Sequence, residues 1–441
     1  MAGLNDPLQD PYPVRRAERL GGVVEPPGSK SISHRALNLA LIGQRPATIE
    51  SLLEADDIAA FREALKRMGW HLERVSGTEV RVEPPPGGPP EAPVRLDCRS
   101  AGTLLRFLIA SCAVTPGEWI LDGSPRLRER PIGPLLTTLR RLGASIDELG
   151  RPGCAPIRIR GGALAGGKVE IDAGESSQYV SALLMAALRA KAPVELLAPF
   201  LVSSPYVDTT LQVMADFGAS VASGDAGEGR KFRIEPHRPE APGGRYRVAG
   251  DDSAAAYPAA AAAICGGRVR LRGLASASTQ GDRAFLGLLE QMGAAVRTTP
   301  GEIEVAGDGR LRALDCDLSG MPDQVPTLAA AAAFARGVTT IRNVAHLRIK
   351  ESDRLAAIGT ELRRSSVPVE ELPDGLRIEG NPSLSAAPGA PRVLIDTYDD
   401  HRIAMSMALV GLRRGGLAIR RPAVVGKSYP GFWADLEGIA L

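Results

Sequence analysis

The sequence is poor in the residues that build disulfide frameworks and metal centres. Its 441 residues include only five cysteines and five histidines. The cysteines are scattered and never spaced as CxxC, and the histidines form no HExxH pair. The sequence therefore predicts neither a disulfide scaffold nor a metal site, and most of the cysteines are expected to be small core residues.

Long hydrophobic runs and an excess of one charge are also missing. No uninterrupted apolar run approaches the length of a membrane span, and residues 1–20 have neither a signal-peptide core nor a basic, acid-free transit pattern. The 53 basic and 51 acidic residues are interspersed, with a net charge of +2, which argues against nucleic acid as a partner. We expect a cytoplasmic protein without membrane or nucleic-acid partners, whose ligands could still be small anions.

Lysine is scarce as well, because only seven of the 53 basic residues are lysine. In a chain so biased towards arginine, a lysine indicates a position that needs a compact, rotatable ammonium group. Lys30, Lys350 and Lys427 each lie in a motif discussed below. The other four lysines are expected to be ordinary surface residues.

Internal repetition is what the chain has in abundance. Four segments end alike, in KRMGW, RRLGA, ADFGA and EQMGA, and each follows an amphipathic run and precedes a strand-like stretch. Their glycines are predicted to end helices. They are Gly69, Gly143, Gly218 and Gly293.

A second series of segments interleaves with the first, each a polar cluster followed by a helix rich in alanine and leucine and then by a strand. Six members are present, among them SKSISHRALNLAL, DDSAAAYPAAAAA and DDHRIAMSMALVG. Helices that are apolar on nearly every side should be buried. Together the two series predict an α/β protein of six strand–helix–strand–helix–strand–strand units. A chain of this length favours two domains, and the Pro- and Gly-rich residues 239–250 mark a boundary.

The first helix start raises a question of charge. The stretch PPGSKSISHR places Lys30 and Arg35 beside three serines at the mouth of a helix, where the helix dipole disfavours cations. Serine caps and free backbone N–H groups make a helix start an anion site, and added cations strengthen it. Taken alone, the stretch also fits a capped surface helix with two solvated cations.

Nine motifs in a fixed order carry a resemblance to a known family. They are PGSKSISHRAL, RSAGTLLR, LRERPIG, GESSQYVSALLMA, SSPYVDTTL, MPDQVPT, LRIKESDRL, YDDHRIAM and VGKSYPGFW. Together they resemble the 5-enolpyruvylshikimate-3-phosphate synthase family over residues 26–433. The resemblance implies an enzyme that transfers the enolpyruvyl group of phosphoenolpyruvate to the 5-hydroxyl of shikimate 3-phosphate and releases phosphate, by addition and elimination through a tetrahedral intermediate. This is a step of the shikimate pathway to aromatic amino acids, and the family uses no metal or organic cofactor.

The same resemblance implies a fold. It is the two-domain enolpyruvyl transferase fold, an inside-out α/β barrel of six βαβαββ repeats, three in each domain, that closes on both substrates. One domain is expected to span residues 28–246, and the other to combine residues 1–27 with 247–441. We expect a monomer.

The resemblance also assigns binding residues. Those expected to face phosphoenolpyruvate are Lys30, Gly102, Arg130, Gln178, Arg354, Arg402 and Lys427. Those expected to bind shikimate 3-phosphate are Lys30, Ser31, Arg35, Ser176, Ser177, Gln178, Ser203, Tyr206, Asp323, His346 and Lys350. Each substrate carries a carboxylate and a phosphate, so lysine and arginine are needed to offset the repulsion when the two are brought together.

Proton transfer requires a base for the 5-hydroxyl and an acid for the methylene carbon. The resemblance implies that Asp323 is the base and that Glu351 gives and retakes the carbon proton. Lys350 is a second candidate for the hydroxyl proton, Lys30 joins the catalytic set, and His401 supports the proton transfers with a lower rank than Glu351.

Three positions depart from the family pattern, and several alternatives stay open. Many members have Asn at the position of Ser100, some have Asn at that of His346, and some have Pro at that of Phe107.

Gly102 leaves room beside the phosphoenolpyruvate site, so glyphosate is expected to compete with that substrate. Singly, KESDR, PDQVPT and ESSQ also fit ordinary helix starts and turns.

Rival functions are a UDP-N-acetylglucosamine enolpyruvyl transferase, a non-catalytic binder of sugar phosphates and an RNA-processing enzyme. The first typically has a catalytic-loop cysteine and a Lys-Asn helix start, and this chain has neither. The second is disfavoured by the presence of Asp323 and Glu351, and the third by the near-neutral charge.

Overall fold

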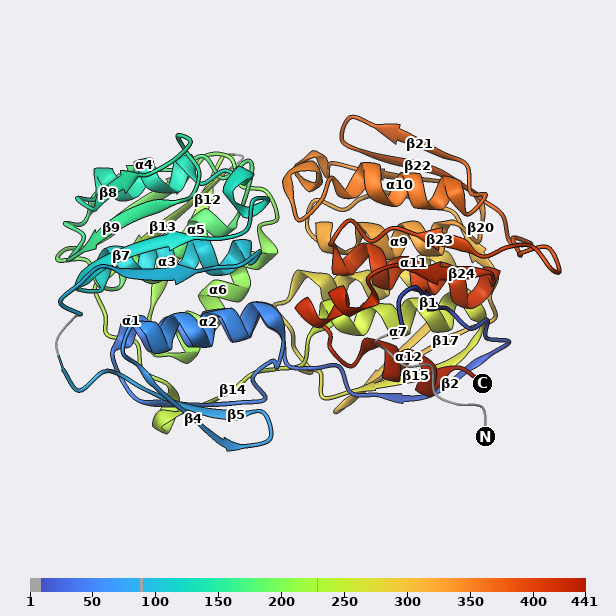
Figure 1. The fold of residues 1–441 in the computed structure, drawn as a ribbon, viewed down its shortest axis with the longest axis horizontal. Helices are drawn as coiled ribbons and strands as arrows, with labels where there is room; N and C mark the ends of the chain where they lie inside the picture. Colours follow the sequence, from blue (N-terminus) through green and yellow to red (C-terminus); the bar gives the residue numbers. More distant parts are fainter. Residues whose placement is uncertain (1–8, 88–89, 228) are drawn as a thin grey trace. The chain divides into compact units, whose positions relative to one another are not determined.

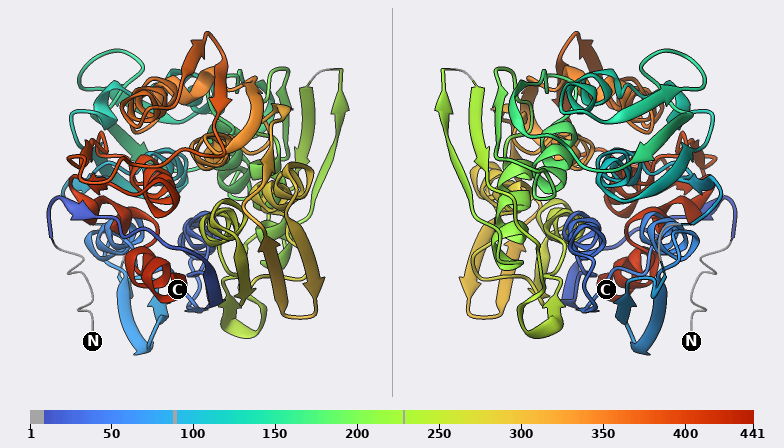
Figure 2. Two further views of the ribbon diagram at one scale, coloured as in Figure 1. Left: turned by 90° about the vertical axis from the view of Figure 1, so that its right-hand side faces the viewer. Right: turned by 90° about the vertical axis from the view of Figure 1, so that its left-hand side faces the viewer.

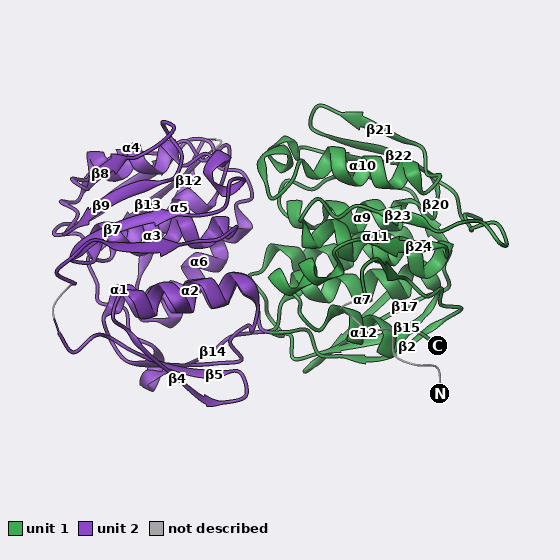
Figure 3. Ribbon diagram, viewed as in Figure 1, with its two compact units in different colours: residues 1–27, 250–441 green, residues 28–249 purple. Residues whose placement is uncertain are grey.

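The computed structural model describes residues 9–87, 90–227 and 229–441. The chain divides into two compact units, unit 1 with residues 1–27 and 250–441 and unit 2 with residues 28–249 (Figure 3). The buried hydrophobic side chains form two separate clusters, one in each unit. Each unit therefore has its own core.

Six helices are buried along almost their whole length, as the sequence predicts. In unit 2 they are α1 (Lys30–Gly43), α3 (Gly102–Val114) and α5 (Gln178–Ala187), and in unit 1 α7 (Asp252–Cys265), α9 (Val325–Ala332) and α11 (His401–Arg414). Within each unit the three helices pack against one another. Their many alanines permit this because a small side chain lets neighbouring helices approach closely.

Each unit contains three small sheets that pack against its buried helices (Figure 1). In unit 2 the hydrogen-bonded orders are β14 (Arg245–Arg247), β3 (Ala47–Glu50), β5 (Glu79–Glu83), β4 (His71–Ser76); β6 (Val94–Asp97), β7 (Gly117–Asp122), β9 (Ile157–Gly161), β8 (Ser145–Glu148); and β10 (Gly167–Glu170), β11 (Val194–Ala198), β13 (Gly229–Ile234), β12 (Val221–Ala226). In each sheet the first pair is parallel and the later pairs are antiparallel.

Unit 1 repeats this arrangement with strands from both ends of the chain. Its orders are β2 (Leu20–Val24), β15 (Gly267–Arg272), β17 (Glu302–Gly307), β16 (Ala295–Thr299); β18 (Leu311–Arg312) and β19 (Asp315–Asp317) beside β20 (Ala335–Arg342), then β22 (Gly375–Gly380), β21 (Val369–Leu372); and β23 (Val393–Ile395), β24 (Leu417–Ile419), β1 (Tyr12–Pro13). Strands β1 and β2, dark blue in Figures 1 and 2, complete two sheets of the C-terminal half.

A second series of helices is amphipathic; each of the first five joins two strands of its repeat, and the last one follows the final strand. They are α2 (Asp56–Arg67), α4 (Gly133–Arg141), α6 (Pro205–Asp216), α8 (Phe285–Met292), α10 (Arg354–Arg364) and α12 (Phe432–Ile439). The four predicted glycines end α2, α4, α6 and α8 with positive φ, between 81° and 116°. This confirms their role as helix caps.

The fifth repeat ends its helix without a glycine. Ser366 has a φ of 68° after α10, and the next N–H, of Val367, donates to the carbonyl of Leu362 at 3.0 Å. The N–H after Gly69 makes the same bond, five residues back, in the first repeat. The sequence pattern missed this cap because a serine took the place of the glycine.

Membrane-spanning helices and disulfides are not features of the described chain. No helix within residues 9–87, 90–227 and 229–441 is long and apolar enough to cross a membrane. All five cysteines are described and have free thiols. Cys98, Cys112 and Cys154 are buried, which confirms that most of the cysteines are core residues.

Candidate active site

Helix α1 carries a buried arginine, Arg35, whose hydrogen-bond acceptors are hydroxyl and carbonyl oxygens. Arg35 is only 2% exposed. Its Nε donates to Thr210 Oγ1 at 2.8 Å, and its two terminal nitrogens donate to Ser31 Oγ at 2.6 Å and to the Tyr206 carbonyl at 2.8 Å. The structure thus joins three predicted site residues, Arg35, Ser31 and Tyr206.

Arg35 is a buried cation whose hydrogen-bond acceptors include no carboxylate in the described part of the chain. Burial lowers the pKa of Arg35 to about 10, so the guanidinium is still charged at neutral pH. Phe107, one of the positions that depart from the family pattern, places its ring 5.4 Å from the guanidinium carbon. A buried charge without a counter-charge is costly, so this site favours an incoming anion.

Lys30, at the first turn of α1, has a partner that the sequence analysis missed. Its Nζ lies 3.3 Å from Oδ2 of Asp57, which is buried at the start of α2. The carboxylate offsets the unfavourable position of a cation at a helix N-terminus. Gly28 lets the chain pass just before this helix, because an added Cβ would lie 1.9 Å from the carbonyl oxygen of Ser51.

Two guanidinium groups converge on the start of α3. A Cβ added to Gly102 would lie 2.5 Å from Arg130 Nη1 and 2.9 Å from Arg106 Nη1. Arg106 Nη1 also donates to Gln178 Oε1 at 2.9 Å, and Gln178 Nε2 donates to Thr103 Oγ1 at 2.9 Å. Gly102, Arg130 and Gln178 were predicted, whereas Arg106 was missed although it lies one turn after Gly102 in the quoted motif.

Three predicted serines lie at the starts of α5 and α6. Ser176, Ser177 and Ser203 are all buried, between 4% and 6% exposed. Ser176 Oγ accepts a hydrogen bond from the N–H of Gln178 at 3.3 Å, and Ser203 has a left-handed φ of 53°. Hydroxyls together with helix N-termini provide the donors that a phosphate group requires.

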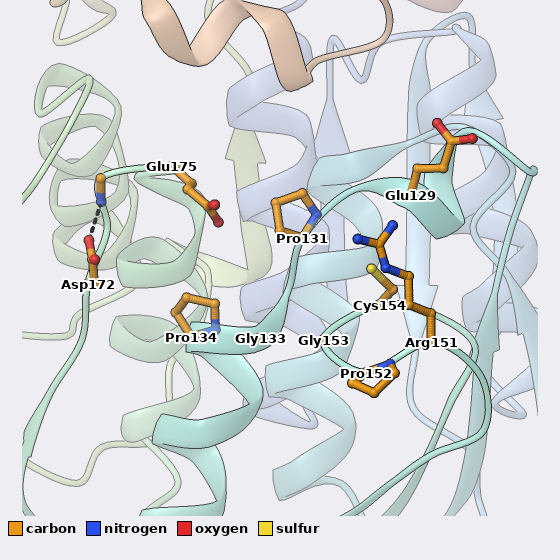
Figure 4. Close-up of a pocket in the computed structure, with 11 residues that line it drawn as sticks. Glu129, Pro131, Gly133, Pro134, Arg151, Pro152, Gly153, Cys154, Asp172 and Glu175 are labelled. Carbon is orange, nitrogen blue, oxygen red and sulfur yellow. Dashed lines mark hydrogen bonds between the residues drawn. The ribbon is translucent and has the colours of Figure 1, made fainter.

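A cavity of about 380 Å³ borders the loops that carry Arg130 and Ser176. It is lined by residues within 129–134, 151–154 and 172–175, and Figure 4 shows Glu129, Arg151 and Glu175 among them. The N–H of Ile132 donates to the carbonyl of Gly153 at 2.8 Å. The segment at 151–154 thus supports the loop that follows Arg130.

In unit 1, a single arginine binds three carboxylates. Arg354 is 2% exposed, and its Nε, Nη1 and Nη2 donate to three different side chains. The acceptors are Asp400 Oδ2 at 2.7 Å, Asp323 Oδ1 at 2.8 Å and Glu351 Oε2 at 2.8 Å. Asp400 was not among the predicted site residues, although its motif was recognised.

The network extends to two more predicted cations. Arg402 Nη2 donates to Asp323 Oδ2 at 2.6 Å, and Lys427 Nζ lies 3.5 Å from Glu351 Oε1. The Asp323 side chain is 27% exposed, against 13% for Glu351 and 5% for Arg402. Asp323 is therefore the carboxylate of this network that an incoming molecule reaches most easily.

The charges in this network shift the pKa values of its members. Burial raises the pKa of Asp323, but the nearby charges of Arg402, Arg354 and Lys350 outweigh burial and hold it well below its usual range. Burial lowers the pKa of Arg354, but its three carboxylate partners outweigh this and raise it well above normal. These ion pairs keep both the Asp323 carboxylate and the Arg354 guanidinium ionised.

The two predicted histidines of unit 1 lie close to these charges. Burial, followed by the positive charge of Lys350, lowers the pKa of His346 to about 4, so its ring is neutral at physiological pH. A neutral imidazole can offer a donor and an acceptor, as an Asn side chain does. His401 is 1% exposed, and its Nδ1 lies 3.7 Å from Oδ1 of Asp400.

The predicted residues fall into two groups, one in each unit. Unit 2 contains Lys30, Ser31, Arg35, Gly102, Arg130, Ser176, Ser177, Gln178, Ser203 and Tyr206, and unit 1 contains Asp323, His346, Lys350, Glu351, Arg354, His401, Arg402 and Lys427. Within the described ranges no group of three or more His, Cys, Asp or Glu residues could hold a metal ion.

Comparison with known proteins gives matches over almost the whole chain. The family model described as EPSP synthase (3-phosphoshikimate 1-carboxyvinyltransferase) matches residues 14–436. A 3-phosphoshikimate 1-carboxyvinyltransferase of Syntrophobacter fumaroxidans is 45% identical over 416 residues, which are 93% of this chain and 95% of the relative. One of Methanoculleus marisnigri is 43% identical over 417 residues, 94% and 96% of the two chains.

Solved structures agree with these matches. The 2.37 Å structure of an EPSP synthase from Acinetobacter baumannii is similar with a TM-score of 0.76 and 27% identity, and covers 98% of each chain. A second structure of EPSP synthase from that organism gives a TM-score of 0.76 at 26% identity. The fold class expected from the sequence is thereby confirmed.

Proposed function

The chain belongs to the EPSP synthase (3-phosphoshikimate 1-carboxyvinyltransferase) family, and we propose that its two groups of polar residues divide substrate binding and proton transfer between them. The protein is an enolpyruvyl transferase of the shikimate pathway, which makes precursors of aromatic amino acids. It moves the enolpyruvyl group of phosphoenolpyruvate to shikimate 3-phosphate. The residue roles below are inferred from contacts, burial and charge.

The observation that supports the binding of shikimate 3-phosphate is the buried charge of Arg35. Among the described residues its buried charge has neutral acceptors only, and the hydroxyl of its neighbour Ser31 can also donate, so the pair fits the carboxylate of shikimate 3-phosphate. Ser176, Ser177 and Ser203 bind the 3-phosphate, with Gln178 and Tyr206 beside the ring. His346 and Lys350, which lie in unit 1, are also assigned to shikimate 3-phosphate.

We assign the binding of phosphoenolpyruvate to cations that are present in each unit. Lys30 and Arg130 bind it from unit 2, where Gly102 leaves the space into which Arg130 Nη1 reaches. Arg354, Arg402 and Lys427 bind it from unit 1. In the structure these three cations form ion pairs with Asp323, Glu351 and Asp400.

The ion pairs of unit 1 make the proton affinity of Asp323 depend on the binding of phosphoenolpyruvate. When the carboxylate and phosphate of phosphoenolpyruvate bind Arg354 and Arg402, the hold of these arginines on Asp323 weakens and its proton affinity rises. The 5-hydroxyl oxygen then bonds to C2 of phosphoenolpyruvate while its proton passes to Asp323, or to Lys350. At the same time, C3 gains a proton from Glu351, which takes up this proton from solvent once phosphoenolpyruvate binds Arg354 and Lys427 and weakens their hold on its carboxylate.

Elimination completes the transfer. The bond between C2 and the phosphate oxygen breaks, phosphate leaves, and Glu351 retakes a proton from C3, so that the C2–C3 double bond is restored. His401, next to Asp400, holds the Asp400 carboxylate in position, and Asp400 in turn holds Arg354 through their ion pair. Lys30 stabilises the negative charge that develops on the leaving phosphate.

Phosphate release tests this assignment. Purified protein is given phosphoenolpyruvate with either shikimate 3-phosphate or UDP-N-acetylglucosamine, and the assay is repeated with Glu351→Gln and Lys30→Ala. The matched control is Lys168→Ala, which removes an exposed surface lysine that pairs with Glu195. We expect release only with shikimate 3-phosphate, nearly lost in the two site variants and unchanged in the control.

The opposite outcomes separate the alternatives. Release with UDP-N-acetylglucosamine would identify the rival acceptor. Binding of shikimate 3-phosphate without phosphate release in the wild-type protein would favour a non-catalytic binder. Full activity of Glu351→Gln would overturn its role in carbon protonation.

We further propose that residues 28–246 form one domain and residues 1–27 with 247–441 the other, which is supported by the compact units 28–249 and 1–27 with 250–441. A monomeric state and a cytoplasmic location stay predictions from the sequence. Light scattering measures the first, and fractionation of cells the second.

A further inference from the structure

The loop that follows Arg130 is held by residues that the proposed function leaves unassigned. Arg130 comes directly before Pro131, and its backbone is extended, with a φ of −76° and a ψ of 129°. A proline restricts the residue before it to such conformations and fixes its own φ. The next peptide group, which joins the carbonyl of Pro131 to the N–H of Ile132, is planar. The orientation of this peptide group therefore sets the course of the chain at Arg130.

This peptide group is hydrogen-bonded at both ends. Its N–H, of Ile132, donates to the carbonyl of Gly153 at 2.8 Å. Its oxygen, of Pro131, accepts a hydrogen bond from the Tyr179 hydroxyl at 2.7 Å and another from Nη2 of Arg106 at 3.1 Å. The tyrosine makes the shorter of the two bonds to the carbonyl. Rotation of the peptide group would break all three bonds, so they fix the loop at this point.

The Tyr179 hydroxyl is a polar group in the core of unit 2. Tyr179 is the second residue of α5 and is 0% exposed. Burial raises the pKa of its phenol, so the hydroxyl keeps its proton and can donate it. Glu175 Oε2 is 3.4 Å from this hydroxyl, and the single proton goes to the nearer Pro131 carbonyl (both residues are labelled in Figure 4). A phenylalanine would fill the same space without a polar group to satisfy, so the loop accounts for the hydroxyl.

Arg130 needs a fixed loop because its guanidinium lies directly against the start of α3. A Cβ added to Gly102 would lie 2.5 Å from Nη1 and 2.6 Å from Cζ of Arg130. Arg130 is 5% exposed, so its guanidinium has little room to move. A group that binds a ligand in a fixed geometry loses much of its effect when it is displaced by about 1 Å.

The aromatic ring of Tyr179 has a separate contact. The guanidinium carbon of Arg106 lies 5.4 Å from the ring centroid, and Nη1 of the same arginine donates to Gln178 Oε1 at 2.9 Å. Stacking of this kind needs the ring and not the hydroxyl. Tyr179→Phe should therefore remove the bond to the Pro131 carbonyl and leave Arg106 and Gln178 in place.

We infer that Tyr179 is a positioning residue for the binding of phosphoenolpyruvate: its hydroxyl fixes the Pro131 carbonyl and thereby holds the guanidinium of Arg130 beside Gly102. This inference rests on the proposed function, in which Arg130 binds phosphoenolpyruvate. Tyr179 acts through Arg130 and touches neither substrate.

The experiment compares steady-state kinetics of the wild-type protein, Tyr179→Phe and a matched control, Tyr12→Phe. Tyr12 is 2% exposed, and its hydroxyl donates to Glu437 in unit 1. For Tyr179→Phe we expect the KM for phosphoenolpyruvate to rise about five- to tenfold, with kcat and the KM for shikimate 3-phosphate within about twofold of wild type. Tyr12→Phe also removes a buried hydrogen bond, but it should leave all three constants within about twofold of wild type.

A double-mutant cycle tests whether Tyr179 acts through Arg130. Arg130→Ala by itself should raise the KM for phosphoenolpyruvate by more than Tyr179→Phe does, because it removes the guanidinium. In the Arg130→Ala background, the further change Tyr179→Phe should alter this KM by less than about twofold, because no guanidinium is left to position.

The other outcomes overturn the inference in distinguishable ways. If Tyr179→Phe keeps the wild-type KM for phosphoenolpyruvate, or raises both KM values alike, the hydroxyl has a structural role only and the proposed function stands. If its effect is undiminished in the Arg130→Ala background, Tyr179 does not act through Arg130. If Arg130→Ala leaves the KM for phosphoenolpyruvate unchanged, the assignment of Arg130 fails and the role of Tyr179 fails with it.

Discussion

Arg35→Gln is expected to weaken the binding of shikimate 3-phosphate while hardly changing the free energy of unfolding. Burial lowers the pKa of Arg35 from its usual value to about 10. A pKa shift of this size corresponds to about 3 kcal/mol between the charged and neutral forms. Because the folded-state pKa is below the unfolded value, the charged form opposes folding at every pH below about 10, and this penalty disappears only as the pH rises above 12.

The substitution removes that penalty together with several hydrogen bonds. Arg35 donates to Thr210, Ser31, Ser181 and the Tyr206 carbonyl. Such bonds contribute about 1 kcal/mol each in net terms, and a glutamine amide can keep some of them. The gain and the loss nearly cancel, so the free energy of unfolding at pH 7.5 should lie within about 1 kcal/mol of wild type.

A second buried arginine provides the contrast. Arg354→Gln leaves Asp323, Glu351 and Asp400 without their shared cation. Breaking a buried ion pair in this way costs about 3–5 kcal/mol. The same chemical change should therefore destabilise the protein at position 354 and hardly affect its stability at position 35, because within the described part of the chain Arg354 has carboxylate partners and Arg35 has none.

Two assays check this reasoning. Urea unfolding measures the stability of both variants, and calorimetry measures shikimate 3-phosphate binding by Arg35→Gln. Loss of a charge-assisted contact of about 2 kcal/mol or more should weaken binding at least about 30-fold. Equal destabilisation by the two variants would show that Arg35 is held for its hydrogen bonds, and unchanged affinity would remove it from the acceptor site.

Other predictions follow from single contacts. Gly102→Ala should raise the KM for phosphoenolpyruvate in steady-state assays, because its Cβ would lie 2.5 Å from Arg130 Nη1; an unchanged KM would contradict this. Glyphosate should inhibit competitively with phosphoenolpyruvate, and inhibition that is independent of phosphoenolpyruvate concentration would refute the shared site. The pKa of Asp323 is held below its usual value, so its stabilising effect is present above about pH 4 and is lost at lower pH; the difference in urea stability between wild type and Asp323→Asn should shrink from pH 7 to pH 3. Ser366→Gly should stabilise the protein by about 0.5–1 kcal/mol in the same urea assay, because the residue has a φ of 68°, and destabilisation would show that the serine side chain is needed.

The local features of the fold were predictable because their causes are local. A glycine after an amphipathic run ends a helix through its own backbone freedom, as at Gly293 with a φ of 116°. The cap at Ser366 escaped prediction because serine seldom adopts this conformation, so its sequence carries no signal.

The candidate site was only partly predictable. The motifs pointed to Arg354, Glu351 and Asp323, and all three belong to one network. Asp57 and Arg106 were missed because an acid or an arginine near a helix start is common. Their roles depend on Lys30 and Gln178, which they meet only in the folded chain.

By itself, the sequence determined the six repeats, the buried helices and the polar residues at their starts, because helix periodicity and capping act over a few neighbouring residues. Only the tertiary structure decided which cations are neutralised. Arg35 meets Thr210, 175 residues away along the chain, and no carboxylate of the described residues, whereas Arg354 meets acids from three motifs. Burial and counter-charge come from residues distant in the chain, and these two quantities set the charge and proton affinity of each side chain.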